Sequence, residues 1–97
     1  TKEVFIDSGK NSTMVSDAVV MGDRDVYLLS AQGGQQMTLS ISSTEDNAEF
    51  DVVSPSGVIL GTNLTAEKVF LPDTGEYQVI VGATRDKATY ELEIGIE

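Results

Sequence analysis

The residues of this chain that could carry chemistry are few, because it contains neither histidine nor cysteine. Their absence removes the commonest general base, the commonest metal ligand and every thiolate. A serine nucleophile would then need a lysine as its base. The lysines do not lie in any Ser-x-x-Lys arrangement; they are Lys2, Lys10, Lys68 and Lys87. The sequence therefore predicts no nucleophilic catalysis and no cofactor.

Paired carboxylates are the remaining catalytic possibility, since glycoside hydrolysis needs two of them across a sugar cleft. The obvious pairs are Asp23 with Asp25 and Glu91 with Glu93. Glu91 and Glu93 lie two positions apart in an alternating run, so both should point away from the face that carries Leu92. A solvated outer face is the favoured interpretation of this pair, and the sequence therefore predicts a protein that is not an enzyme.

Calcium is the one metal whose oxygen ligands the chain could supply. The candidate loops are 23–25 and 45–47, both of which contain two acidic residues. Neither has the ordered spacing of ligands that a dedicated calcium loop requires, and Arg24 interrupts the first. The sequence thus predicts solvated loop charges here and no metal site.

Arg85 is the most interesting single charge, because it is one of two arginines and stands between Thr84 and Asp86 in a loop between two expected strands. The planar guanidinium can pair with a carboxylate through two parallel hydrogen bonds, and arginine is enriched at binding hot spots. Two interpretations stay open on these residues alone. Arg85 either contacts a partner or pairs locally with Asp86 or Glu91.

The overall charge limits the possible partners. The chain has 16 acidic and 6 basic residues, which gives a net charge of −10. Such a charge repels nucleic acid and anionic lipid and favours a cationic protein partner. No apolar run reaches the roughly 18 residues that span a bilayer, so membrane insertion is not expected. Oligomeric state is left open by the sequence.

Short alternating runs separated by turn residues predict an all-β sandwich or barrel, in one domain covering residues 1–97. The expected strands lie at about 2–7, 12–20, 26–31, 37–42, 48–53, 58–60, 69–71, 77–81 and 90–96. Gly33 and Gly34 predict a tight turn, and 54–57 predicts a β-turn with Pro55 at its second position. We expect 37–42 to pair with 48–53, and 77–81 to form a hairpin with 90–96. That hairpin would carry Arg85 at its charged tip.

Three segments of the chain resemble the bacterial pre-peptidase C-terminal domain family, namely 25–37, 50–57 and 71–79. The segment 81–92 is similar to that of the periplasmic inhibitors of goose-type lysozyme. The resemblance implies an antiparallel, jelly-roll-like β-sandwich of about eight or nine strands, secreted or periplasmic and without catalytic activity.

The resemblance also implies a binding site. Inhibitors of this kind block the lysozyme cleft with loop residues that include an arginine, and this arginine corresponds to Arg85, with Thr84 and Asp86 beside it. Aromatic residues tend to follow the glycine that matches Gly22, whereas this chain has Asp23 and Arg24 there. We therefore take these residues as the candidate partner-binding set, with a lysozyme as the candidate partner. The alternative is an accessory domain of a secreted hydrolase that assists secretion or substrate attachment, with calcium as a stabilising ion.

Overall fold

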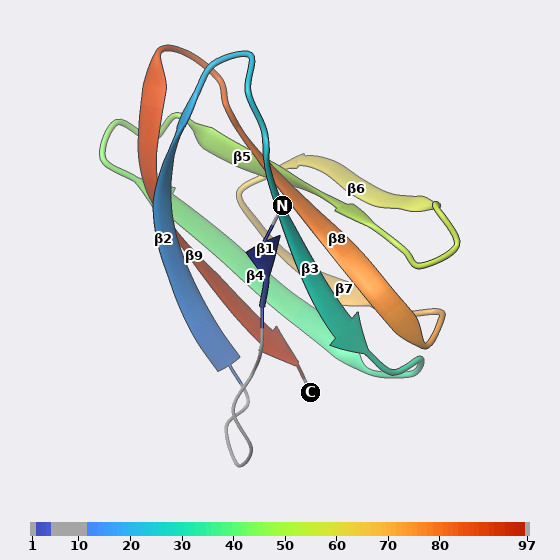
Figure 1. Ribbon diagram of the computed structural model, residues 1–97. Helices are drawn as coiled ribbons and strands as arrows, with labels where there is room; N and C mark the ends of the chain where they lie inside the picture. Colours follow the sequence, from blue (N-terminus) through green and yellow to red (C-terminus); the bar gives the residue numbers. More distant parts are fainter. Residues whose placement is uncertain (1, 5–11, 97) are drawn as a thin grey trace.

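The computed structural model describes residues 2–4 and 12–96, which form strands and no helix (Figure 1). The nine strands are β1 (Lys2–Glu3), β2 (Ser12–Val20), β3 (Asp25–Ala31), β4 (Gln36–Ser43), β5 (Ala48–Val53), β6 (Ile59–Leu64), β7 (Ala66–Phe70), β8 (Gly75–Ala83) and β9 (Lys87–Ile96). The described part of the chain therefore holds no helix that is long and apolar enough to cross a membrane. The all-β prediction is confirmed.

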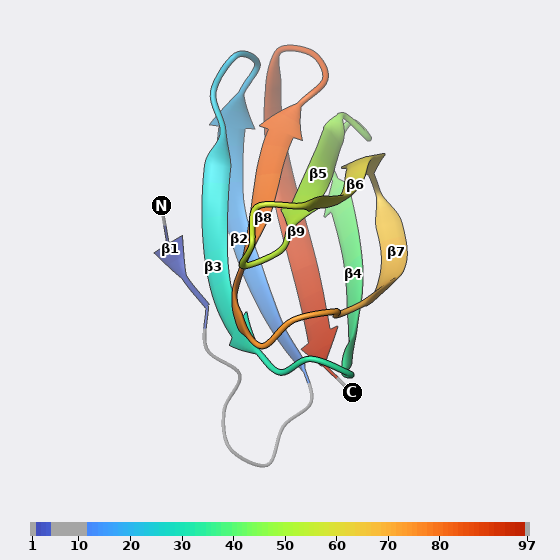
Figure 2. The same ribbon diagram turned by 90° about the vertical axis from the view of Figure 1, so that its right-hand side faces the viewer.

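The strands form two sheets that face each other (Figure 2). One sheet has the order β1-β3-β8-β5-β6, and the other has the order β2-β9-β4-β7. All pairs are antiparallel except β1 with β3, where Lys2 lies opposite Tyr27 in parallel register. Two four-stranded sheets in this order, with β1 added at one edge, have the topology of a jelly roll, which confirms the expected sandwich.

Two of the predicted strand pairings are wrong. β4 and β5 lie in opposite sheets, and so do β8 and β9. The turn at Gly33 and Gly34 likewise joins β3 to β4 in the other sheet, although Gly34 has the positive φ of 92° expected of a tight turn. Alternation shows which side chains face inward, but an inward face looks the same in either sheet. Among connections from β2 onward, β5–β6 alone is a hairpin, closed by the Gly57 N–H donating to the Ser54 carbonyl at 3.0 Å.

The strand bounds also differ from expectation in two places. The segment 61–68, expected to be a loop, is almost entirely strand, with β6 and β7 separated by Thr65 alone. The first strand, expected over about 2–7, is described as β1 at Lys2–Glu3, and residues 5–7 lie outside the described residues. In β3 the outward side chains of Val26 and Leu28 are half-buried. β2 matches the predicted span.

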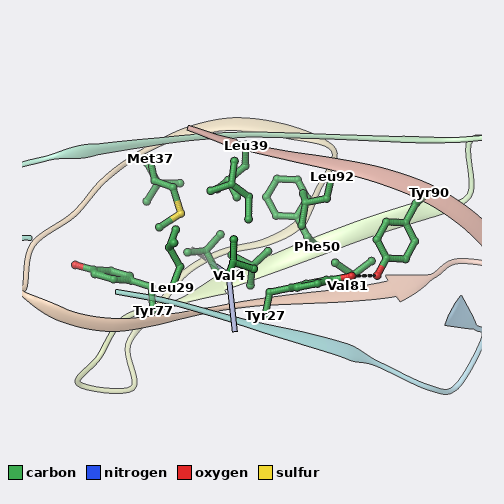
Figure 3. Close-up of a cluster of buried hydrophobic side chains, with 14 of the residues drawn as sticks. Val4, Tyr27, Leu29, Met37, Leu39, Phe50, Tyr77, Val81, Tyr90 and Leu92 are labelled. Carbon is green, nitrogen blue, oxygen red and sulfur yellow. Dashed lines mark hydrogen bonds between the residues drawn. The ribbon is translucent and has the colours of Figure 1, made fainter. Parts of the chain in front are cut away.

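The core lies between the sheets and is built from the inward residues of both (Figure 3). Tyr77, Val79 and Val81 of β8 face Tyr90, Leu92 and Ile94 of β9, and all six are at most 1% exposed. The same period of two that predicts half-buried strands therefore places these residues opposite one another, on separate sheets. Each inward aliphatic side chain of this kind stabilises the fold by about 1.5–3 kcal/mol through burial. This packed core fixes the ends from which the loops emerge.

Candidate functional site

Three connections meet at one end of the sandwich, and we call them together the three-loop end. They are 21–24 between β2 and β3, 44–47 between β4 and β5, and 84–86 between β8 and β9. The first and the last stand side by side at the top of Figures 1 and 2. Because each of these connections passes from one sheet to the other, it closes the end of the core. The predicted site residues Asp23, Arg24, Thr84, Arg85 and Asp86 all belong to this end.

Main-chain hydrogen bonds join the three loops. The Met21 N–H donates to the Asp86 carbonyl at 2.7 Å, which links the first loop to the third. The Thr84 N–H donates to the Asn47 carbonyl at 2.8 Å, which links the third loop to the second. Since buried or half-buried main-chain groups gain from being paired, these contacts hold the loops in one arrangement. The three-loop end is thus a connected surface.

Arg85 is exposed, and its guanidinium Nη2 donates a hydrogen bond to the Glu45 carbonyl oxygen at 2.5 Å. Among the described residues, no ion pair joins Arg85 to Asp86 or Glu91, the partners expected for a purely local role. A contact to a carbonyl oxygen leaves the guanidinium its positive charge and most of its five N–H donors. Arg85 is therefore held at the surface and keeps the capacity to pair with a carboxylate.

Thr84 and Asp86 flank Arg85 in different ways. The Thr84 hydroxyl donates to the Asn47 carbonyl at 3.3 Å, so it turns toward the neighbouring loop. Asp86 is exposed and has a φ of 50°, in the left-handed region that few residues other than glycine adopt, although aspartate tolerates it best. The reversal at Asp86 turns the chain sharply after Arg85.

Arg24 lies on the outer face of the five-stranded sheet, over Gly82 of β8. A Cβ at Gly82 would stand 2.9 Å from the Arg24 Nη1, so the missing side chain makes room for the guanidinium. Arg24 also donates to the Asp23 carbonyl at 2.9 Å. A hollow of about 120 Å³ is lined by Arg24, Thr84 and several other residues, which brings the first and the third loop to one feature of the surface.

Two apolar residues that the sequence reasoning did not single out stand at the same end. Val20 and Met21 are 50% and 58% exposed, where the first loop begins. A protein interface combines apolar contact area with a polar rim, and methionine is enriched in such contacts. Val20 and Met21 therefore supply apolar area at the same end of the sandwich as Arg85. A Val-Met pair just before a predicted loop is the signal that could have found them.

A buried hydrogen-bond network lies beneath the three-loop end and bridges the two sheets (Figure 3). The Tyr90 hydroxyl of β9 donates to the Asp25 carboxylate at 2.6 Å and lies 2.5 Å from the Tyr27 hydroxyl of β3. Burial raises the pKa of both tyrosines above the ordinary value, and for Tyr90 the hydrogen bond to Asp25 raises the pKa further. Both phenols are therefore neutral at physiological pH. No pattern in the sequence indicates that these aromatic residues meet.

The carboxylates that were considered as catalytic or calcium ligands do not gather. Glu91 and Glu93 are exposed on the outer face of β9, as expected of an alternating strand. Within residues 2–4 and 12–96, no three acidic groups lie in an arrangement that could hold a metal ion. The three-loop end accordingly offers hydrogen bonding, charge and apolar area, which are the means of a binding surface.

These features define a class: a jelly-roll β-sandwich that presents a connected loop surface at one end. The chain matches no protein-family model and no curated protein sequence. Its fold is that of the crystal structure of Aeromonas hydrophila PliG, a periplasmic lysozyme inhibitor of g-type lysozyme, with a TM-score of 0.86 at 23% identity, covering 100% of this chain and 96% of that one.

Two further inhibitors of the same description share the fold. Salmonella Typhimurium PliG matches with a TM-score of 0.76 at 27% identity over 98% of this chain and 96% of its own. A mutant of the Escherichia coli protein matches with a TM-score of 0.76 at 23% identity, over 99% and 96%. The structural resemblance to periplasmic inhibitors of g-type lysozyme thus extends over nearly the whole of each chain.

Proposed function

We propose that this protein is a non-catalytic, periplasmic inhibitor of goose-type (g-type) lysozyme that binds the enzyme through its three-loop end. The observation that carries the proposal is the match over almost the full length of both chains to Salmonella Typhimurium PliG, at 27% identity. The match leaves little of either chain uncovered, and this supports a shared role more strongly than a match to one part of the chain would. A fold shared only in its core would support a weaker conclusion.

Arg85 is the residue that we expect to enter the enzyme cleft. A glycosidase cleft carries carboxyl groups that act on the scissile bond. A guanidinium placed among them would pair with a carboxylate through two hydrogen bonds and would exclude the substrate. In this proposal Thr84 and Asp86 flank the contact, while Asp23 and Arg24 lie at its margin and Val20 and Met21 add apolar area.

The acidic charge of the protein suits a cationic enzyme. With a net charge of −10, the protein would attract a basic partner over distances of about a Debye length, roughly 8 Å at physiological salt. Such attraction raises the association rate more than it slows dissociation. We therefore expect inhibition to weaken at high salt, mainly through slower association.

The test is an inhibition assay of goose-type lysozyme with the wild-type protein, Arg85→Ala and a control, Lys68→Ala. Lys68 lies in β7 opposite Thr38, near the start of β4, whereas the three-loop end follows the end of β4. Both variants lose one positive charge, so both should be steered to a cationic enzyme slightly better than the wild type. Inhibition by Arg85→Ala should nevertheless be weaker than that by the wild type by about tenfold or more, because the complex dissociates faster, as expected of a hot-spot arginine.

Three results would contradict the proposal. The wild type would show no inhibition at micromolar concentration, or the two variants would behave alike, or Arg85→Ala would inhibit as well as the wild type. Absence of inhibition would leave the accessory-domain alternative, which the family models do not support.

A further inference from the structure

Asn47 is a polar residue buried at the edge of the three-loop end. It is the last residue before β5 and is 1% exposed, although the two residues before it, Glu45 and Asp46, are exposed. A buried amide is costly unless it makes hydrogen bonds, so its contacts show what it does. These contacts lead almost entirely to the loop that carries Arg85.

The side-chain amide of Asn47 donates two hydrogen bonds to that loop. Its Nδ2 donates to the Arg85 carbonyl at 2.9 Å and to the Lys87 carbonyl at 3.1 Å. Both partners are acceptors, which fixes the NH₂ group on that side, and Oδ1 has no hydrogen-bond partner among the described residues. The two amide protons thus hold the carbonyl before Asp86 and the carbonyl after it, on either side of the sharp turn.

The main chain of Asn47 holds the residue before Arg85. Its carbonyl accepts hydrogen bonds from the Thr84 N–H at 2.8 Å and from the Thr84 hydroxyl at 3.3 Å. Its own N–H donates to the Ser43 Oγ at 2.8 Å, a contact that does not involve the loop carrying Arg85. Asn47 therefore contacts Thr84, Arg85 and Lys87, and it connects them to β5, which begins at the next residue.

The conformation of the loop needs such support. Asp86 has a φ of 50°, and a left-handed residue other than glycine costs on the order of 1 kcal/mol unless its surroundings enforce it. The two bonds from Asn47 Nδ2 lie on either side of this residue. The loop is thereby kept in the conformation that presents Arg85, even when no partner is bound.

We propose that Asn47 is the positioning residue of the inhibitory surface: it fixes the loop that presents Arg85 before the enzyme arrives, without itself touching the enzyme. The inference rests on the proposed function and goes beyond it by naming a buried determinant of affinity. A loop that is already ordered loses less conformational freedom on binding, so affinity is higher. Removing the two donated bonds should weaken inhibition although the contacting side chains remain.

The first test is a double-mutant cycle with Asn47→Ala and Arg85→Ala in the lysozyme inhibition assay. Asn47→Ala alone should weaken inhibition about tenfold or more, since it removes two hydrogen bonds that hold the loop. In the Arg85→Ala background the same change should cost less than about threefold, because the residue that it positions is gone. Ser43→Ala is the matched control, since it removes one hydrogen bond to Asn47 but keeps both bonds from Nδ2. Equal costs of Asn47→Ala in the two backgrounds would overturn the proposal.

The second test needs no enzyme, so it separates failure of this inference from failure of the proposed function. Order parameters of the main-chain amides of residues 84–87 should fall in Asn47→Ala from about 0.85, typical of rigid backbone, toward about 0.6 or below. Those of β8 and of the Ser43→Ala control should stay as in the wild type. Unchanged order parameters in Asn47→Ala would overturn the inference even if the wild type inhibits. If Asn47→Ala does not fold, Asn47→Ser is measured instead, because serine keeps a small polar group there but cannot reach both carbonyls. A wild type that does not inhibit overturns the inference together with the proposed function.

Discussion

Replacing Tyr90 with phenylalanine should destabilise the protein more than replacing Tyr27, although the two side chains look alike in the sequence. The difference follows from the direction of the hydrogen bonds. The Tyr90 hydroxyl has one proton and donates it to the Asp25 carboxylate at 2.6 Å. The 2.5 Å contact between the two hydroxyls must then use the proton of Tyr27. Tyr90 is thus the central member of the network.

The two changes remove different numbers of bonds. Tyr90→Phe loses the bond to a charged acceptor, which contributes about 1.5–3 kcal/mol, and also leaves the buried Tyr27 proton without its acceptor. We expect a total loss of about 2–4 kcal/mol of unfolding free energy. Tyr27→Phe loses only the bond between the hydroxyls and keeps that to Asp25, so its cost should be about 1 kcal/mol. The ring volumes are unchanged, so no cavity adds to either value.

Urea denaturation followed by circular dichroism measures both variants, and thermal unfolding gives a second reading. For a domain of this size 1 kcal/mol corresponds to roughly 4–8 °C in Tm, so Tyr90→Phe should melt about 10 °C or more below the wild type. The reasoning is refuted if Tyr27→Phe costs as much as Tyr90→Phe, or if Tyr90→Phe costs less than about 1 kcal/mol, the typical contribution of a single hydrogen bond between neutral groups.

Two further predictions concern alkaline pH and the turns. Because burial raises the pKa of Tyr27 and Tyr90 in the folded state, the folded protein keeps these protons after an unfolded chain has lost them near pH 10. The unfolding free energy from these two groups should therefore be fully present below about pH 10 and fall above it. The fall in the urea midpoint should be shallower in Tyr90→Phe. Gly75→Ala should lower the unfolding free energy by about 2 kcal/mol or more, since Gly75 has a φ of 152° and a Cβ there would stand 2.9 Å from the Pro55 Cβ. Gly34 has a φ of 92°, but a Cβ there would meet nothing within 4 Å, so Gly34→Ala should cost only about 1 kcal/mol. Similar unfolding free energies for the two alanine variants would contradict the second prediction.

The sequence predicted which side chains face inward better than it predicted which strands are neighbours. The inward sets of β8 and β9 are those of the alternating pattern, for example Val79 and Leu92, because a period of two follows from the backbone itself. Sheet membership depends on whether a connection folds back in the plane of the sheet or crosses to the other one. Short polar turns such as 84–86 occur in both kinds of connection, so the sequence pattern did not distinguish a hairpin within one sheet from a connection between the two sheets.

The candidate site shows the same division. Arg85 was found because it is one of two arginines and stands in a short loop between two expected strands. Its placement beside Thr84 and Asp86 follows from the sequence, since they are adjacent. Asn47 was missed, because an asparagine in a polar acidic run is normally solvated, and only the packing of two distant loops buries it. The network beneath was missed for the same reason.

The position of β9 affects when the three-loop end can form. β9 is the last strand of the described chain, yet it lies between β2 and β4 in its sheet, and Tyr27 meets Tyr90 across 63 positions of sequence. During synthesis β2 and β4 therefore lack their common neighbour until β9 has been made. Folds dominated by such distant pairings form slowly. A chain that stops before β9 has no three-loop end at all. Binding by this protein would consequently report that the chain has been made through β9 and folded.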